Sequence, residues 1–205
     1  MTLRYARHFL PGLLLLLMAG CATQAPTPDF DRQLGDWKSQ RATLEDLRTW
    51  TLAGKVGLRT PRDSQSANLD WVQQPARYRM MISGPFGAGR NVLAGTADKV
   101  TLTNGDGTFT ADTPEQLMDE QLGWSLPVSA LDYWVRALPD PRSYSDIDHD
   151  AAGFPAELRQ AGWTIRYLDW TYADGLWLPS RLKMTYGDLT ATLVVTEWQP
   201  DRARS

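Results

Sequence analysis

The segment that decides the fold is residues 50–60, WTLAGKVGLRT. Its apolar side chains occupy alternate positions, separated by small or polar residues: Trp50, Leu52, Val56 and Leu58. A period of two places these side chains on one face of an extended strand, whereas a helix would need a period of about 3.6. The segment therefore predicts a strand with one buried face and one face toward solvent.

The same alternation recurs through most of the chain after residue 60. It predicts further strands at residues 69–71, 78–82, 90–95, 98–103, 157–160, 163–169, 179–186 and 189–198. Two-residue turn signals join some of these segments, at Asn104-Gly105-Asp106-Gly107 and at Gly187-Asp188. Strands that follow one another through tight turns pair antiparallel, so we expect an antiparallel sheet.

Three segments carry helical patterns instead. Residues 30–48 place apolar side chains at three- and four-residue steps, and residues 127–138 do the same. Between them, Thr113-Pro114-Glu115-Gln116 is a capping-box pattern that starts a helix ending near Gly123. The predicted fold class is α+β, mainly β, with helices packed on one side of the sheet and no internal repeat.

The first twenty residues are typical of a secretory signal. Arg4 and Arg7 precede an apolar run at 9–18 that is too short to span a bilayer as a helix. The run ends in Leu-Met-Ala-Gly-Cys, which resembles the bacterial lipobox and implies cleavage before Cys21 and lipid on its sulfur and amine. An ordinary signal with an incidental cysteine is the alternative. We expect a signal at 1–20 and a lipidated, flexible tether at 21–29.

Composition and motifs exclude several classes of function. Cys21 is the one cysteine, so no disulfide is expected, and the formal charge of −3 is unsuited to nucleic acid. There is no Gly-x-Ser-x-Gly elbow, and His149 lies in a segment that we interpret as a polar, solvated turn at 146–150, without the spacing of a calcium loop. We therefore predict no catalytic residue, no metal site, no cofactor and no enzyme activity.

The glycine-rich stretch at 83–89, SGPFGAG, invites comparison with a phosphate-binding loop. Its glycine order differs from the dinucleotide fingerprint, and a strand rather than a helix is expected to follow it. Phe86 at its centre then has two interpretations, a side chain tucked into the core or one offered to a membrane or partner. The residues alone favour the first.

The tryptophans leave a similar choice open. The chain has nine, and Trp71, Trp134 and Trp163 lie on segments expected to face inward. They could fill a core or line an apolar cavity, since a buried indole suits either environment.

Several segments taken together resemble the LolB family, the outer-membrane receptors for lipoproteins. They are WTLAGKVGLRT at 50–60, SANLDWVQ at 66–73, YRMMISGPFGAG at 78–89, LGWSLPVSALDYWVRAL at 122–138 and LRQAGWTIRY at 158–167. The resemblance implies an open, curved antiparallel half-barrel over residues 30–200, covered by a few helices and enclosing an apolar cavity. Residues 201–205 would form a tail.

The resemblance also implies partners and sites. The periplasmic carrier LolA would deliver lipoprotein cargo, whose acyl chains would enter the cavity of a monomer held on the periplasmic face of the outer membrane by acylated Cys21. A loop of Pro85, Phe86 and Gly87 would insert the cargo, with Phe86 where the family usually has Leu. The cavity would be lined by Leu69, Trp71, Met80, Ile82, Trp134 and Trp163. A structural lipoprotein with a filled core is the main alternative, and an enzyme acting on lipid is a third.

Overall fold

The computed structural model describes residues 31–96 and 99–202, apart from the side chain of Phe86. The expected signal at 1–20, the lipidation site Cys21 and the tether at 21–29 lie outside the described residues. Most of the expected tail, residues 203–205, lies outside them as well.

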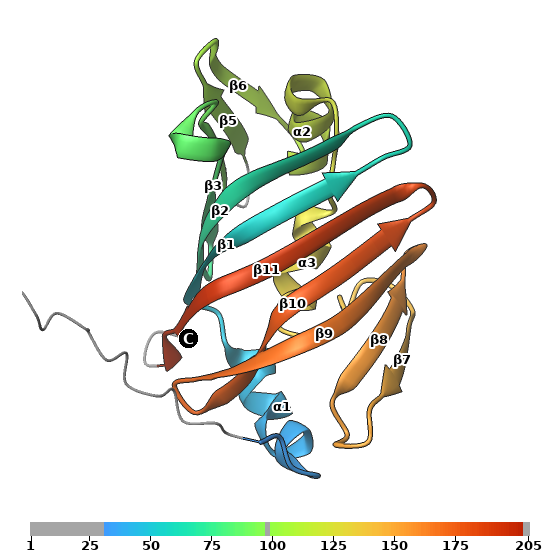
Figure 1. Cartoon of the computed structure of the whole chain (residues 1–205). Coiled ribbons are helices and arrows are strands. Elements are labelled where there is room, and N and C mark those ends of the chain that lie inside the picture. The colour runs from blue at the N-terminus through green and yellow to red at the C-terminus, as the bar shows by residue number, and fades with distance from the viewer. Residues whose placement is uncertain (1–30, 97–98, 203–205) are drawn as a thin grey trace, which may run out of the picture. The chain divides into compact units, whose positions relative to one another are not determined.

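A single antiparallel sheet of eleven strands forms most of the described chain (Figure 1). Its strands, in chain order, are β1 (Trp50–Arg59), β2 (Ser64–Gln74), β3 (Arg77–Ser83), β4 (Asn91–Thr96), β5 (Val100–Asn104), β6 (Gly107–Ala111), β7 (Ser145–His149), β8 (Pro155–Gln160), β9 (Trp163–Ala173), β10 (Leu176–Tyr186) and β11 (Leu189–Pro200). The expected turn at Asn104–Gly107 joins β5 to β6, and Gly187-Asp188 joins β10 to β11.

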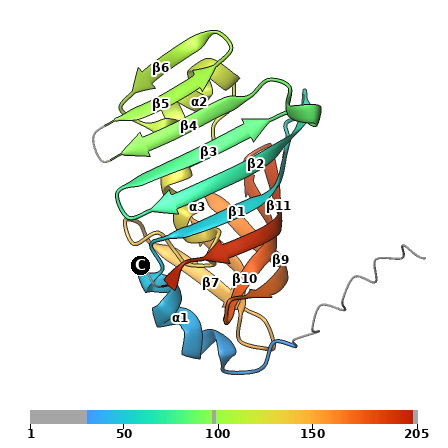
Figure 2. The ribbon, with the colours of Figure 1, turned by 90° about the vertical axis from the view of Figure 1, so that its left-hand side faces the viewer.

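The strand order divides the sheet into two meanders. Strands β1 to β6 follow one another in one half and β7 to β11 in the other, and the pairing of β1 with β11 joins the halves. The sheet curves but does not close, so β6 ends it at one edge and β7 at the other (Figures 1 and 2). This arrangement confirms the expected fold class, an open antiparallel sheet with a few helices.

Three α-helices pack against the sheet: α1 (Asp36–Asp46), α2 (Pro114–Leu122) and α3 (Val128–Trp134). Helix α1 contacts β10, and α2 contacts β5 and β6. Helices α2 and α3 belong to the long connection between β6 and β7, and α3 lies behind β1 and β11 in Figure 1. The connection between the two meanders therefore covers the inner face of the sheet.

Helix α2 begins and ends as its sequence predicts. The Thr113 hydroxyl accepts a hydrogen bond from the Gln116 amide at 3.2 Å, and Pro114 occupies the first helical position. At the other end, Gly123 adopts a left-handed backbone with φ of 72°, which stops the helix.

Two expectations differ from the structure. The helix expected over 30–48 spans only Asp36–Asp46, and the left-handed Gly35 (φ 101°) precedes its first turn. The prediction of a solvated turn at 146–150 was wrong, because Ser145–His149 form the edge strand β7. Asp146 and Asp148 both accept hydrogen bonds from Arg159 on β8 at 2.8 Å. The edge strand therefore carries charged side chains, which disfavour its pairing with a strand of another chain.

The inner face of the sheet carries the predicted apolar stripe. Trp50, Leu52, Val56 and Leu58 of β1 are all buried. The Trp50 ring packs edge-on against Trp71 of β2 at 4.8 Å and against Trp198 of β11 at 5.3 Å between centroids. The three indoles pack together where the two meanders meet, at the pairing of β1 with β11.

Gly54 permits a close approach of β1 to β11, beside an irregularity in their register. A Cβ atom at this position would collide with the Val194 carbonyl oxygen and lie 3.0 Å from the Val195 Cα. At Gly57, three residues along the same strand, the nearest atom to an added Cβ is 4.0 Å away.

We predict that Gly54→Ala lowers the free energy of unfolding by about 1–3 kcal/mol. The atoms that the new Cβ would meet belong to the backbone of β11, which cannot move aside as a flexible side chain can. Gly57→Ala is the matched control and should change it by no more than about 0.5 kcal/mol. Urea unfolding followed by tryptophan fluorescence measures both. Equal effects of the two substitutions would contradict the close-approach explanation.

Candidate functional site

An apolar cavity lies between the inner face of the sheet and helices α2 and α3. Its volume is about 30 Å³. Every side chain that lines it is apolar: Val56, Leu69, Trp71, Met80, Ile82, Met118, Trp124, Leu126, Val128, Leu131, Val135, Met184 and Leu193. Four of the six residues expected to line a cavity are among them, namely Leu69, Trp71, Met80 and Ile82.

An open groove of about 450 Å³, which we call the mouth, adjoins this cavity. The mouth is lined by Val56, Leu58, Gln65, Ser66, Ala67, Ile82, Gly84, Ala88, Gly89, Asn91, Gln121, Leu122 and Trp124. Val56, Ile82 and Trp124 line both spaces, so these three side chains form the boundary between the mouth and the cavity.

The α2–α3 connection, Gly123–Pro127, covers this boundary. Its sequence is GWSLP, and it supplies half-buried Trp124 to both spaces and buried Leu126 to the cavity. The amide of Val128 donates to the Leu126 carbonyl at 2.8 Å, a tight turn that leads into α3. Trp124 is held at the boundary by a short irregular segment, whose backbone can rearrange at smaller cost than a sheet strand.

The glycine-rich loop lies at the rim of the mouth. The Gly84 amide donates to the Ala88 carbonyl at 2.8 Å, and Pro85–Gly87 form one turn of 3₁₀-helix with exposed Pro85. Gly87 has φ of 78°, a left-handed conformation that favours glycine. Phe86 is the central residue of this turn, and its side chain is outside the described part of the structure. Strand β4 follows the loop, as expected.

The far end of α3 is fastened by buried polar groups. Gln160 of β8 accepts hydrogen bonds from the Trp134 indole at 2.8 Å and the Asp140 amide at 2.9 Å, and it donates to the Asp140 and Ser143 carbonyls. The Tyr167 hydroxyl donates to the Trp134 carbonyl at 3.1 Å. Burial raises the pKa of Tyr167 far above its ordinary value, so this donor stays neutral.

Arg136 fastens the same end of α3 to α1. Its guanidinium donates to the Leu44 and Leu47 carbonyls at 2.7 and 3.0 Å and pairs with Asp132 at 3.3 Å. Burial lowers the pKa of Arg136 and raises the pKa of Asp132, while their mutual attraction opposes both shifts. The helical cover is thus tied by hydrogen bonds at its α1 end and held mainly by apolar contacts over the cavity.

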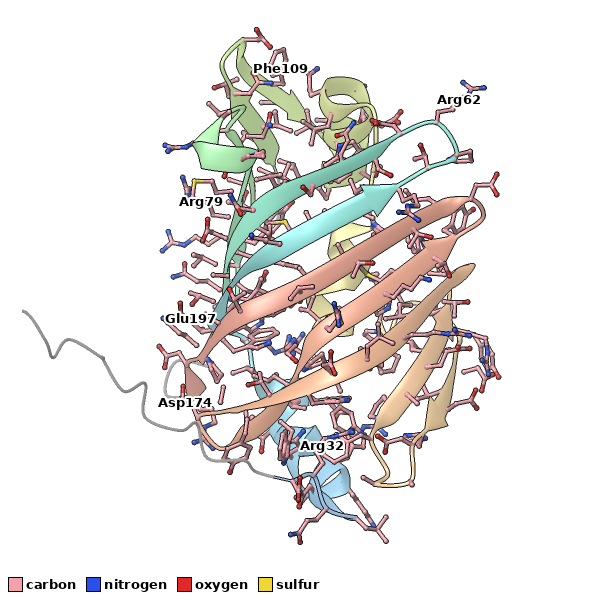
Figure 3. The ribbon with its side chains drawn as sticks, viewed as in Figure 1. Arg32, Arg62, Arg79, Phe109, Asp174 and Glu197 are labelled. Carbon is pink, nitrogen blue, oxygen red and sulfur yellow. The ribbon has the colours of Figure 1, made fainter. Side chains whose placement is uncertain are left out.

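Trp134 and Trp163, the other two expected cavity residues, are not among those that line the cavity. They pack against each other at 6.0 Å between centroids, and Trp134 is fully buried. A second aromatic cluster lies beside α1, where Arg32 stacks over Phe154 at 5.0 Å and over Trp170 at 5.5 Å. Figure 3 shows Arg32 at this lower end of the domain. Trp134, Trp163 and Trp170 therefore fill the end of the interior away from the cavity, whereas Trp71 and Trp124 line the cavity together with aliphatic and methionine side chains.

The volume of the cavity sets a condition on any ligand. An engineered apolar cavity of about 150 Å³ binds one benzene, so a space of about 30 Å³ is too small for an acyl chain. The described form has no room for an acyl chain, so the walls of this space would have to move apart before a chain could occupy it.

Comparison with known protein families finds one that matches most of the chain. Residues 48–198 match the family model described as outer membrane lipoprotein LolB. The chain belongs to the LolB family.

Relatives in the LolB family match almost the whole chain. The outer-membrane lipoprotein LolB of Chromohalobacter salexigens is 61% identical over 194 residues, which cover 95% of this chain and 91% of the relative. The LolB protein of Pseudomonas aeruginosa strain PAO1 is 44% identical, with 95% and 96% covered. The localisation expected for this chain, the outer membrane, agrees with these relatives.

Solved structures support the fold assigned to the LolB family member. A LolA superfamily protein from Nitrosomonas europaea has a TM-score of 0.51 at 9% identity, covering 82% of this chain and 96% of that one. A protein from Desulfovibrio piger has a TM-score of 0.53 at 5% identity, covering 81% and 91%. At these identities the likeness concerns the fold alone.

Sequence reasoning missed Trp124 as a site residue. It lies within the GWSLP segment that carries the resemblance to the LolB family, so a signal for it was present. Within residues 31–96 and 99–202, no helix is long and apolar enough to cross a membrane. The same residues contain no group of three or more His, Cys, Asp or Glu side chains that could hold a metal ion.

We predict that Gln160→Leu lowers the free energy of unfolding by about 3–5 kcal/mol, because it leaves several buried polar groups without partners. Gln73→Leu is the control, since half-buried Gln73 accepts one hydrogen bond from the Trp71 indole and donates one to the Gln74 carbonyl, and a loss of about 1–2 kcal/mol is expected. Chemical denaturation measures both. A loss at Gln160 no larger than that at Gln73 would argue against the anchoring role.

We also predict that acyl chains perturb Trp71 and Trp124 but leave Trp134 unchanged. Protein labelled with 5-fluorotryptophan gives one ¹⁹F resonance per indole, and single Trp→Phe variants assign them. Addition of a diacylated lipopeptide should shift the Trp71 and Trp124 signals. A shift at Trp134 with none at Trp71 would place the chains elsewhere.

Proposed function

We propose that this protein is an outer-membrane receptor that accepts lipoproteins from the carrier LolA, binds their acyl chains in its cavity and inserts them into the outer membrane. The observation that carries the proposal is the wholly apolar cavity beside an open mouth with which it shares three lining residues, in a member of the LolB family. Each buried CH₂ of an acyl chain is worth about 0.8 kcal/mol, so the chains cannot cross water unshielded.

Entry of the chains requires the cavity to open. The end of α3 nearest α1 is tied by Arg136, Gln160 and Tyr167, so the α2–α3 connection is the part that moves. Acyl chains would replace the contacts of Trp124 and Leu126 with the sheet. Because apolar contacts with the sheet are replaced by apolar contacts with the acyl chains, the free-energy cost of opening is small.

Delivery to the bilayer uses the rim of the mouth. Phe86, at the centre of the Pro85–Gly87 turn, would enter the lipid and bring the mouth to the surface. Burial of one aromatic side chain supplies about 1.5–3 kcal/mol, enough to orient a protein but too little to anchor it. Acylated Cys21 would provide the anchor, and a tether of about ten residues would let a monomer reach both the carrier and the membrane.

The proposed transfer contains no chemical step. No titratable side chain lines the cavity among the residues that the structure describes. The proposed transfer needs no enzyme activity, and its direction follows from the greater affinity of the bilayer for the chains.

A structural lipoprotein with a filled core is the second candidate. The volume of about 30 Å³ favours it, since a closed interior is also what a protein without an acyl ligand would have. The two functions differ in whether the interior opens to a lipopeptide.

A reconstituted transfer assay tests the proposal. Lipoprotein is supplied on LolA, and the acceptor liposomes carry the acylated mature protein in their membrane. The unmodified protein should move lipoprotein from carrier to liposome, and failure to take any cargo would favour the filled-core function. Phe86→Glu should still accept cargo but insert it at least about tenfold more slowly, because a carboxylate resists entry into lipid. Phe86→Leu, which keeps an apolar side chain, is the matched control and should retain insertion. Normal insertion by Phe86→Glu would remove the loop from the mechanism.

A further inference from the structure

The mouth differs from the rest of the surface in having no charge. Charged residues make up 22% of the chain, yet no Lys, Arg, Asp or Glu is among the described residues that line the mouth. Its polar side chains are three carboxamides and one hydroxyl: Gln65, Asn91, Gln121 and Ser66.

These neutral groups come from three elements that surround the entrance. Gln65 and Ser66 lie on β2, Asn91 begins β4, and Gln121 lies in the last turn of α2. Trp124, at the boundary with the cavity, adds an indole N–H. Any molecule whose chains occupy the cavity must place the group that joins those chains among these side chains.

The carboxamides have hydrogen-bonding capacity to spare. Gln65 donates to Asp63 at 2.6 Å and Asn91 donates to the Gly89 carbonyl at 2.8 Å. Each amide nitrogen carries two donors, so one remains on each. The side chains of Gln121 and Trp124 make no hydrogen bond to another described residue, and Gln121 is half-buried.

The basic residues nearest in the sequence do not supply a cation to the mouth. Arg59 and Arg90 flank lining residues, but both are exposed and neither lines the mouth. Arg62 lies at the tip of the β1–β2 hairpin and points away from the domain (Figure 3). A negatively charged group in the mouth would therefore meet no cation among the side chains that line it.

Two kinds of acylated molecule are available at a membrane, and they differ in the charge of the group that joins their acyl chains. In an acylated cysteine the chains are joined by esters, an amide and a thioether, all of them neutral. In a phospholipid the glycerol carries a phosphate anion. Neutral carbonyls suit carboxamide and indole donors, whereas burying an unpaired anion is costly.

We propose that the mouth is a binding site for the neutral ester and amide linkage of an acylated cysteine, and that its lack of charge disfavours phospholipid. Gln121, Asn91 and Trp124 donate to the carbonyls while the chains occupy the cavity. The site thereby selects lipoprotein in a membrane where phospholipid is abundant. This inference rests on the proposed function, since it needs the chains to enter the cavity.

Binding of two matched probes tests the site. One is a neutral peptide whose N-acetylated cysteine carries a dioctanoylglyceryl group, and the other is dioctanoyl phosphatidylglycerol, so the chains are identical. The protein is the mature chain with Cys21→Ala, produced without the signal, and calorimetry measures each Kd below the micelle concentration. We expect the lipopeptide to bind at least about tenfold more tightly, a difference of about 1.4 kcal/mol.

Variants at Gln121 then test the hydrogen bond and the missing charge separately. Gln121→Leu should weaken lipopeptide binding about fivefold through loss of one hydrogen bond. Gln121→Arg should tighten phosphatidylglycerol binding about tenfold by supplying the missing cation. Gln116→Arg is the control, because Gln116 is an exposed residue of the same helix outside the mouth and the change in net charge is the same. Near-ultraviolet circular dichroism verifies that each variant is folded.

The outcomes distinguish this inference from the proposed function. Equal affinity of the unmodified protein for both probes would overturn the selectivity while leaving acyl binding intact. An equal effect of Gln116→Arg and Gln121→Arg would also overturn it, since a general electrostatic attraction would then explain the gain. Binding of neither probe would instead overturn the proposed function, on which the site depends.

Discussion

The pairing of the first strand with the last is the constraint on which the rest of the structure depends. Trp50 of β1 lies opposite Pro200 of β11, so this ladder closes a loop that contains nearly the whole domain. Without it the two meanders would be separate sheets, each with an apolar face exposed. With it they form one curved surface, and the chain between β6 and β7 must cross the inner face to connect them. The close backbone approach at Gly54 belongs to this same ladder.

The interior formed in this way has two unlike ends. Beside α1, aromatic rings interlock and buried hydrogen bonds from Gln160 and Arg136 tie the helices to the sheet. Beside the glycine-rich loop, apolar side chains surround a small cavity and the covering connection is held mainly by apolar contact. Directional bonds resist displacement, whereas apolar contacts can be replaced by other apolar contacts. The fold thus combines an end fixed by directional bonds with an end held mainly by apolar contact.

A closed cavity is suited to a receptor that must release its ligand. If the cavity stood open, apolar walls would hold acyl chains nearly as well as a bilayer does. Because the described form is almost filled, the proposed opening must first separate Trp124 and Leu126 from the sheet, and even a small cost of opening is subtracted from the affinity. The chains then move on to the membrane, where no such cost exists. The neutral mouth would let the same cavity take lipoprotein rather than the surrounding phospholipid.

Much of this architecture could be predicted from the sequence. Alternation at Trp50, Leu52, Val56 and Leu58 identified a half-buried strand, and Thr113 with Gly123 marked both ends of α2, because these signals act through neighbours only a few residues away. The edge strand β7 could not be recognised in the same manner. Its acidic sequence is typical of a solvated turn. The hydrogen bonds from Arg159 on the adjacent strand explain why Asp146 and Asp148 can lie in a sheet, and the sequence alone does not show that contact.

The sequence by itself determined which segments are strands and helices and, through its likeness to the LolB family, the kind of fold. Only the tertiary structure decided which tryptophans face the cavity. Trp71 and Trp134 are both buried indoles on inward-facing positions, but one lines the cavity and the other is bonded to Gln160. The difference depends on which distant strand lies opposite each ring. Trp124 became a site residue in the same way, because the mouth and the cavity exist only after β1, β3 and α2 have come together.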